Sequence, residues 1–232
     1  MSSSKHIENR NDYQTPALVD YIRKAFSPED TRHQYLLDQM QKNNLPEIQI
    51  GASEGKLLQL LIHSCGAKKA VEIGTLGGYS ALWIADALPE GGKLYTMEYD
   101  PKTAAGTEKA LKEVGLSEKV SIVVGDANET LKTIESFGPF DFCFIDADKI
   151  SYPHYLLWAE RNLRPGGIVA ADNAYLFGQV HLNPATAGDD APAISAMQKV
   201  IKILTDPSRF SMSAMIPTGE GLAVGIKKPP AE

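Results

Sequence analysis

The amino-acid sequence predicts one α/β domain built on a doubly wound, mostly parallel sheet. Three observations lead to this prediction. From about residue 67 onward, short apolar segments alternate with segments of helical periodicity, which is typical of a parallel sheet with helices on both faces. A glycine-rich turn follows the first apolar segment, as in nucleotide-binding α/β folds. The last two apolar segments are joined only by Pro217 to Glu220, so they should pair as an antiparallel hairpin.

The size and charge of the chain limit what it can be. The chain has 232 residues, 43% of them hydrophobic, and a formal net charge of −6. This length is sufficient for one large domain, residues 1–232, with a full core. The acidic balance argues against a nucleic-acid partner held by a broad basic face. No apolar run approaches the roughly 18 residues of a membrane span, so no membrane partner is expected.

The ends and the cysteines indicate where the protein works. Residues 1–14 are polar and lack the apolar region of a secretory signal, so we expect a flexible tail there. The two cysteines, Cys65 and Cys143, form no C-x-x-C pair. This sparse usage fits a reducing cytoplasm. The five histidines are scattered without the spacing of a zinc site.

Three helices are expected before the alternating segments, within residues 15–66. Thr15 and Pro16 are typical of an N-cap and a first helical position, and they open a helix to about Phe26. Residues 27–30 should start a second helix that runs to about Lys42. Ser53 should cap a third, which ends at Gly66. The sequence leaves open whether these helices cover a binding site or form a subunit contact.

The core, residues 67–228, follows from the alternation of apolar and periodic segments. The expected strands are 69–73, 93–98, 119–124, 140–145, 167–171, 210–216 and 221–227. The expected helices lie around 81–88, 101–114, 127–134, 155–163 and 193–204, and a turn is expected at 164–167. No internal repeat or low-complexity linker interrupts this order.

The turn after the first strand carries a specific glycine pattern. Glu72, Gly74 and Gly78 form E-x-G-x-x-x-G, which resembles motif I of the class I S-adenosylmethionine (SAM) methyltransferases. The G-x-G-x-x-G pattern of dinucleotide enzymes would need glycine at positions 76 and 79, where this chain has Leu76 and Tyr79. Glycines let such a turn bend sharply and let a ligand approach the backbone.

An acidic residue at the end of the second strand supports a nucleotide site. Glu98 follows the strand about 20 residues after the glycines, and Pro101 then opens a helix. A carboxylate in this position is placed to accept hydrogen bonds from ribose hydroxyls. We therefore predict that Glu98 binds the ribose of the ligand.

Oxygen-bearing side chains follow two further strands. Asp146 comes directly after the fourth strand, and Asp172 and Asn173 follow the fifth. Ligands bind at the carboxyl ends of the strands in a doubly wound sheet, so these three should converge if the strands are neighbours. Oxygen donors without sulfur or imidazole suit a hard cation, Mg²⁺ first and Ca²⁺ or Mn²⁺ next.

Four sequence segments together resemble one enzyme family. E-x-G-x-x-x-G-Y-S, M-E-x-x-P, F-I-D-A-D-K and A-D-N are similar to segments of the cation-dependent O-methyltransferases of the caffeoyl-CoA and catechol type, over roughly residues 46–228. The resemblance implies a seven-stranded sheet of order 3-2-1-4-5-7-6. It also implies SAM and a divalent cation as cofactors, a vicinal dihydroxy-aromatic acceptor such as a catechol or caffeoyl compound, and a homodimer.

The same resemblance implies roles for individual residues. Metal ligands would be Asp146, Asp172 and Asn173. Glu72, Gly74, Gly78, Ser80, Glu98, Ala127 and Asp146 would bind SAM, with Ala127 at the adenine edge. Lys149 would be the general base, beside Asp146 as the second catalytic residue.

Two segments depart from the plant members of that family. The plant enzymes follow D-N with T-L-W-N-G, whereas this chain has Ala174 to Gly178, so we expect the aromatic wall of the acceptor site to be shifted or rebuilt. Residues 49–55 match the plant T-T-S-A-D-E-G run only in part. Two alternatives stay open: a SAM-dependent methyltransferase for another small-molecule or nucleic-acid acceptor, and a nicotinamide-dependent oxidoreductase.

Overall fold

The computed structural model describes residues 15–230, and the tail expected at residues 1–14 lies outside this range. The helices are α1 (Pro16–Phe26), α2 (Thr31–Lys42), α3 (Ala52–Cys65), α4 (Tyr79–Ala87), α5 (Pro101–Glu113), α6 (Ala127–Ile134), α7 (Tyr152–Asn162) and α8 (Ala191–Leu204). The strands are β1 (Lys69–Ile73), β2 (Lys93–Glu98), β3 (Val120–Val124), β4 (Phe140–Ile145), β5 (Leu163–Ala171), β6 (Phe210–Ile216) and β7 (Leu222–Lys227).

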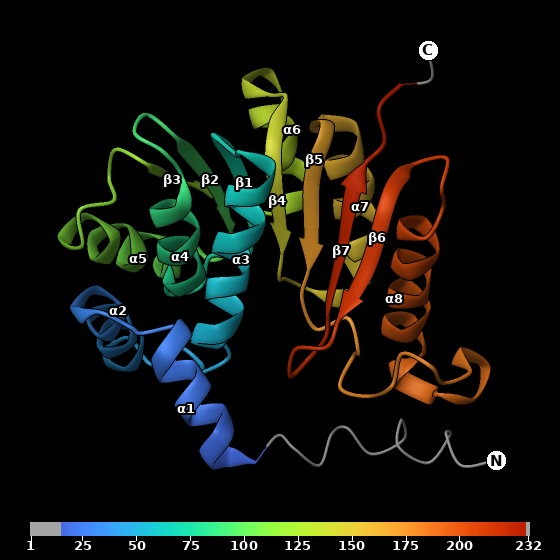
Figure 1. Cartoon of the computed structure of the whole chain (residues 1–232), viewed down its shortest axis with the longest axis horizontal. Helices are drawn as coiled ribbons and strands as arrows, with labels where there is room; N and C mark the ends of the chain where they lie inside the picture. The colour runs from blue at the N-terminus through green and yellow to red at the C-terminus, as the bar shows by residue number, and fades with distance from the viewer. Residues whose placement is uncertain (1–14, 231–232) are drawn as a thin grey trace.

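The strands form one seven-stranded sheet in the order β3-β2-β1-β4-β5-β7-β6. Strands β1 to β5 pair in parallel, whereas β7 runs antiparallel to both β5 and β6. Figure 1 shows the hairpin of β6 and β7 closing one side of the sheet. The doubly wound α/β class, the strand order and the C-terminal hairpin expected from the sequence are therefore confirmed.

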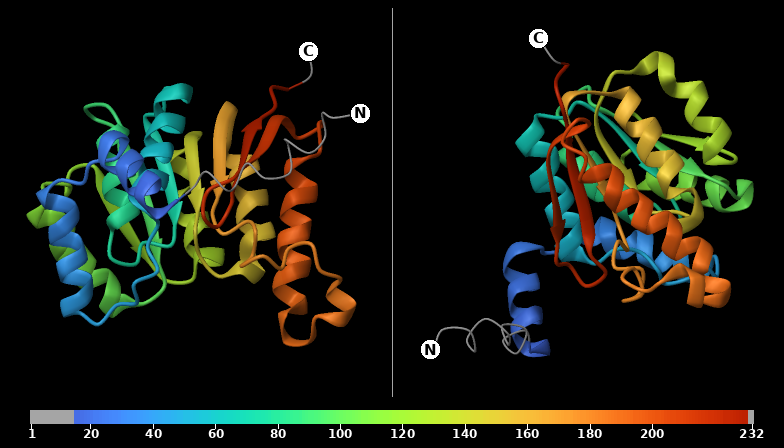
Figure 2. Two further views of the ribbon diagram at one scale, coloured as in Figure 1. Left: turned by 60° about the horizontal axis from the view of Figure 1, so that its bottom comes forward. Right: turned by 90° about the vertical axis from the view of Figure 1, so that its right-hand side faces the viewer.

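Successive residues of each central strand point to opposite faces of the sheet. Ala70 and Phe142 join a cluster with side chains of α3, α4 and α5. Val71 and Cys143 join a second cluster with side chains of α6, α7 and α8. The two clusters place helices over both faces of the sheet, as Figure 2 shows from two further directions. Burial on both faces explains why these strands read as continuous apolar runs.

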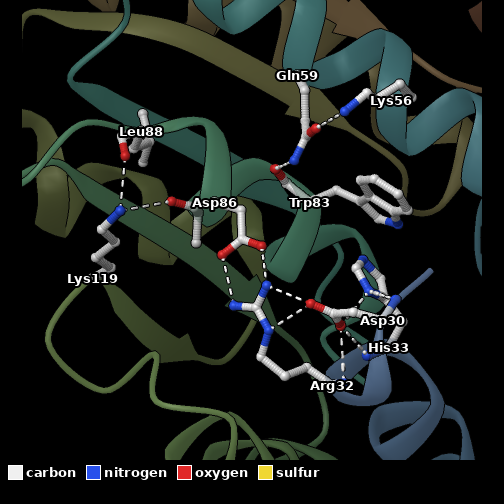
Figure 3. A network of polar contacts seen from close by, with 10 residues as sticks. Asp30, Arg32, His33, Lys56, Gln59, Trp83, Asp86, Leu88 and Lys119 are labelled. Atoms are coloured by element: carbon white, nitrogen blue, oxygen red, sulfur yellow. Dashed lines mark hydrogen bonds and ion pairs between the residues drawn. The ribbon is translucent and has the colours of Figure 1, made fainter. Parts of the chain in front are cut away.

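The N-terminal helix α2 is fixed to α4 by a polar and aromatic contact (Figure 3). The Arg32 guanidinium donates to both carboxylate oxygens of Asp86, at 3.0 and 2.6 Å. The ring of His33 lies 4.3 Å from the ring of Trp83 between centroids. Bidentate arginine–carboxylate pairs have a fixed geometry, so this contact sets how α2 lies on the core.

Helix α2 also reaches the glycine-rich turn. Its Met40 is buried, and a Cβ atom added to Gly77 would lie 2.0 Å from the Met40 Cγ. The absence of a side chain at Gly77 therefore makes room for Met40. By contrast, α1 has no buried residue and projects away from the core (Figure 2).

Three of the differences between observed and predicted boundaries have a cause that the contacts show. The second helix begins at Thr31, because Asp30 is its N-cap and accepts from the N–H groups of Arg32 and His33. The third begins at Ala52, one residue before Ser53, because Gly51 is the N-cap and its N–H donates to Glu54 Oε2 at 2.7 Å.

The third difference concerns the fifth strand, which begins at Leu163 rather than at Gly167. The expected turn at 164–167 is part of this strand. Arg164 is held there because its Nε donates to Asp141 Oδ1 at 2.6 Å, beside a register irregularity between Phe140 and Phe142. No helix within residues 15–230 is long and apolar enough to span a membrane.

Candidate active site

Two cavities open along the carboxyl ends of the parallel strands. The larger, of about 650 Å³, is lined mainly by residues of the segments that follow β1, β4 and β5 and by residues before and at the start of α3. The smaller, of about 550 Å³, lies toward β2, β3 and α6. Gly74, Glu98 and Ala147 line both cavities. An elongated ligand can therefore extend from one cavity into the other.

Gly74 makes the sharp turn at the end of β1. Its φ is +105°, and a Cβ atom there would lie 1.9 Å from the carbonyl oxygen of Asp146. Only glycine fits between these two chain segments. Gly78, with φ +78°, is the N-cap of α4 and does not line either cavity, whereas Ser80 lines the larger one.

Glu98 holds the glycine-rich turn in place. Its Oε2 accepts from the Leu76 N–H at 2.9 Å, and its Oε1 accepts from the Asp100 N–H at 3.0 Å. Leu76 has φ +47°, an unfavourable value for leucine, and the Thr107 hydroxyl fixes its carbonyl at 2.6 Å. A carboxylate oxygen can accept more than one hydrogen bond and Glu98 lines both cavities, so it can still accept from a ligand hydroxyl.

Glu72 is fully buried and does not line either cavity. Its Oε2 accepts from the Thr96 hydroxyl at 2.6 Å, and its Oε1 has no hydrogen-bond partner. Burial raises the pKa of this carboxyl group to about 7. Glu72 thus lies in the core behind the cavities, close enough to Ser80, Asp146 and Glu98 for these residues to influence its pKa.

The three oxygen-bearing residues predicted to converge do lie together. The Asp146 N–H donates to Ile73 O and the Asp172 N–H to Ile145 O, both at 2.9 Å, which continues the parallel pairing one step past the strands. Asp172 is 4% exposed, and its Oδ1 has no partner. Burial, and next the charge of Asp146, raise the pKa of Asp172 to about 7. Asn173 takes a left-handed conformation, φ +53°, that turns the chain here.

Lys149 lies among these oxygens, in a short 3₁₀ helix that begins at Lys149 itself. Its Nζ donates to Asp146 Oδ1 at 3.2 Å, to Asn173 Oδ1, and to the Tyr152 hydroxyl at 2.6 Å. Tyr152 is fully buried and anchors the ammonium group from the side of α7. Among residues 15–230, Lys149 is the one basic side chain that lines the larger cavity, and it is held there against Asp146 and Asn173.

Ala127 lies in the smaller cavity, beside Asp126 and Asp148. Asp126 is the N-cap of α6, which places Ala127 at the first position of that helix. The Tyr155 hydroxyl donates to Asp148 Oδ2 at 2.8 Å and fixes that carboxylate at the cavity wall. Asp148 was visible in the D-A-D-K segment but was not predicted to bind a ligand.

Several lining residues were not predicted at all. Glu54, Phe177 and Glu220 come from the first turn of α3, the loop after β5 and the β6–β7 turn. Phe177 is 72% exposed and has φ +52°. The glycine-rich hairpin turn and the aromatic residue after Asn173 were the only signals in the sequence. Phe177 gives the cavity an aromatic side chain four residues after Asn173, which fits the expectation of a rebuilt wall.

Comparison with known proteins shows which family the chain resembles. The profile of a family described as O-methyltransferase matches residues 26–228. The catechol O-methyltransferase of Niastella koreensis is 43% identical over 162 residues, which cover 69% of this chain and 73% of the relative. The catechol O-methyltransferase of Mycobacterium tuberculosis is 40% identical over 152 residues, 66% of this chain and 67% of the relative.

Solved structures agree with the fold. An O-methyltransferase from Bacillus cereus, in complex with SAH, superposes with a TM-score of 0.83 at 32% identity and covers 91% of this chain and 97% of its own. The O-methyltransferase TomG from Streptomyces achromogenes, in complex with SAM, has a TM-score of 0.82 at 29% identity, covering 92% and 96%.

Proposed function

Because the chain belongs to the O-methyltransferase family, we propose that it moves the methyl group of SAM to one hydroxyl oxygen of a vicinal dihydroxy-aromatic acceptor, with a divalent cation bound. One observation carries this proposal: Asp146, Asp172, Asn173 and Lys149 line or border the same cavity as the glycine-rich turn. The relatives named catechol O-methyltransferase support the acceptor class.

The residues around the two cavities fit SAM. Gly74 lines both cavities and adds no side chain where they meet. Glu98 also lines both and can accept hydrogen bonds from ribose hydroxyls. Ala127 and Asp148 would border the adenine, and Ser80 the methionine part. Gly78 would act by starting α4, and Glu72 by supporting the turn from beneath. When bound, SAM supplies an electrophilic methyl group on a sulfonium.

The oxygen cluster fits a hard divalent cation. Asp172 Oδ1 is buried without a partner, an arrangement that is costly unless a cation or a donor completes it. Asp146, Asp172 and Asn173 offer only oxygen, and Lys149 already places one positive charge among them. A bound Mg²⁺ would acidify an acceptor hydroxyl as a Lewis acid.

The chain itself would position the acceptor and take its proton. Lys149 Nζ lies at the carboxylates, so it can reach a hydroxyl held there. Tyr152 and Asn173 fix the direction of the amine, and Asp146 balances its charge. Phe177 and Ile48, both largely exposed at the cavity, offer apolar contacts to an aromatic ring. Holding oxygen and methyl group in line is the main source of rate.

We also propose a homodimer in the cytoplasm. The apolar side chains of α1 are exposed: Leu18, Val19, Tyr21, Ile22 and Phe26. The family resemblance implies a homodimer, so we propose that a second copy of the chain covers these side chains of α1. Both cysteines are free thiols, as a reducing compartment favours. Residues 15–228 would form one domain, because α2 and α3 share a core cluster with α4.

Methyl transfer can be tested directly. The protein is incubated with SAM, Mg²⁺ and a panel of catechols that includes caffeate and its CoA ester, and mass spectrometry detects an added methyl group. Excess chelator should abolish turnover, and added Mg²⁺ should restore it, while binding of SAM measured by thermal shift should persist. Full activity in excess chelator would refute the metal part of the proposal. A panel with no methylated product would refute the acceptor class.

A further inference from the structure

The larger cavity carries an excess of negative charge. Its acidic lining residues are Glu47, Glu54, Glu98, Asp146, Asp172 and Glu220, and its basic lining residue is Lys149. Asp146 is paired with Lys149, and Glu98 is held by two backbone N–H groups. Within residues 15–230, none of the ion pairs involves Glu47, Glu54 or Glu220.

These three carboxylates reach the cavity from separate elements. Glu47 precedes α3, Glu54 lies in its first turn, and Glu220 lies in the β6–β7 turn. Glu47 and Glu220 are exposed, as are the apolar side chains of Ile48 and Phe177 in the same lining. The exposed part of the cavity therefore offers apolar contacts to an aromatic ring and negative charge to the substituent on that ring.

Buried oxygen atoms in this lining favour a cation or a hydrogen-bond donor over an anion. Asp172 is 4% exposed, and its Oδ1 has no partner. Gln49 lines the cavity as well, and its buried Oε1 also has none. Carboxylate and amide oxygens only accept, so a cation, a hydroxyl or an ammonium group satisfies them and a carboxylate does not.

We propose that this cavity selects acceptors by the charge on the aromatic side chain: a catechol with an ammonium group is preferred over a neutral catechol, and both over an acceptor with a carboxylate or a CoA thioester. Glu47 and Glu220 set this preference. The inference rests on the methyl transfer proposed above and narrows its acceptor class. One unit charge about 8 Å from another through water changes an affinity about two-fold. Glu47 and Glu220 together should therefore make the affinity for a cationic acceptor about tenfold higher than the affinity for an anionic acceptor at low salt.

Three acceptors with the same ring test the order. They are 4-(2-aminoethyl)catechol, 4-ethylcatechol and 3-(3,4-dihydroxyphenyl)propanoate, in which two saturated carbons separate the charge from the ring, so the acidity of the hydroxyls is nearly equal. With SAM and Mg²⁺ at low ionic strength, kcat/KM should fall in that order. The ratio of the cationic to the anionic acceptor should shrink to about two-fold or less in 0.5 M salt, because exposed charges are screened.

A pair of double variants assigns the effect to residues. Glu47→Gln with Glu220→Gln should lower the cation-to-anion ratio of kcat/KM by about five- to tenfold. Glu90→Gln with Glu118→Gln removes the same net charge near the amino ends of β2 and β3, at the opposite edge of the sheet. This control should change the ratio by less than about two-fold, since solvent screens charges at such separation.

Equilibrium binding separates this inference from the proposed reaction. Calorimetry with Mg²⁺ and the demethylated product of SAM measures the affinity of each acceptor without turnover. If 4-ethylcatechol is not methylated but the charge order appears in binding and disappears in the cavity variant, the reaction is wrong and the selectivity stands. An anionic acceptor that binds as well as the cationic one, or a ratio equal in both double variants, overturns the selectivity. Binding of none of the three overturns both.

Discussion

At the scale of single residues, the centre of the site is a lysine surrounded by oxygen atoms. Lys149 donates to Asp146, Tyr152 and Asn173, which leaves its amine no freedom to leave the cavity. A positive charge there compensates carboxylates that would otherwise repel one another when buried. The proposed base is thus also part of the electrostatic balance of the site.

Lys149→Met should lower kcat by about 10²–10⁴, the usual range for the loss of a general base. The deficit should shrink as pH rises and with more acidic acceptors such as nitrocatechols, because solvent then supplies more phenolate. Steady-state kinetics across pH measures this, and Lys132→Met, on the exposed surface of α6, is the matched control. A deficit that is constant across pH and acceptor acidity would assign Lys149 to positioning alone.

Glu72 should make stability depend on pH. Burial raises its pKa to about 7 in the folded protein, against an ordinary value of 4.5. The folded state therefore holds a proton that the unfolded state releases, and the contribution of this group is full below pH 4.5 and lost as pH rises through 7. The free energy of unfolding of Glu72→Gln, measured relative to the wild type, should rise by about 2–3 kcal/mol from pH 5 to pH 8. Urea unfolding at both pH values measures the gain, and Glu90→Gln should show none.

At the scale of elements, the turn between β1 and α4 is held by contacts from three neighbours. Glu98 and Thr107 fix Leu76 in a left-handed conformation, and the carbonyl of Asp146 lies against Gly74. Such a conformation is retained only where surrounding contacts compensate its cost. The turn is therefore preformed by the fold before any ligand binds.

Gly74→Ala should both destabilise the protein and weaken SAM binding. An added methyl group would meet the Asp146 carbonyl, so we expect a loss of about 3 kcal/mol or more in the free energy of unfolding. Gly115→Ala is the matched control, because Gly115 has φ +78° but no atom within 4 Å of an added Cβ. Its cost should be the conformational term alone, about 1 kcal/mol. Equal losses in the two variants would contradict the steric argument.

The elements differ in how well the sequence predicts them. Strands β1, β2 and β4 were predicted with their observed bounds, because each is a short apolar-rich segment bounded by glycine, proline or charged residues. The start of β5 was missed, since Arg164 to Gly167 has turn-like composition and is held by tertiary contacts of Arg164 with Asp141 and the Cys65 carbonyl. Helix starts were misplaced where several capping residues compete, as at Ser27 to Asp30.

The same contrast holds for the candidate site. Asp146, Asp172 and Asn173 follow strands directly, so the parallel topology alone brings them together. Glu54, Phe177 and Glu220 reach the cavity through loops whose paths depend on tertiary packing. Glu72 lies in the expected motif, but the alternation of side chains along β1 turns it into the core.

At the scale of the whole molecule, α1 is the least integrated element. None of its residues is buried, and Tyr21 and Phe26 are 69% and 68% exposed. Apolar surface of this kind is typical of an interface between chains.

Replacing two of these side chains should therefore separate the proposed dimer. Tyr21→Ser with Phe26→Ser should shift the mass measured by light scattering from dimer to monomer, with little change in the melting temperature of the core. Phe137→Ser, an exposed aromatic position before β4, should leave the mass unchanged. A wild-type protein that is monomeric at micromolar concentration would refute the dimer.

The contact of Met40 with Gly77 links α2 to the turn, although no residue of α2 lines either of the two cavities. When α2 separates locally from the core, the backbone of the glycine-rich turn loses its contact with Met40. A ligand that stabilises the turn should therefore make this local separation less frequent. Binding of SAM should slow amide hydrogen exchange along Thr31–Lys42, far beyond the atoms that the ligand touches. The amides of α1 should exchange at the same rate with and without the ligand. The exchange rate of α2 divided by that of α1 therefore reports whether the site is occupied.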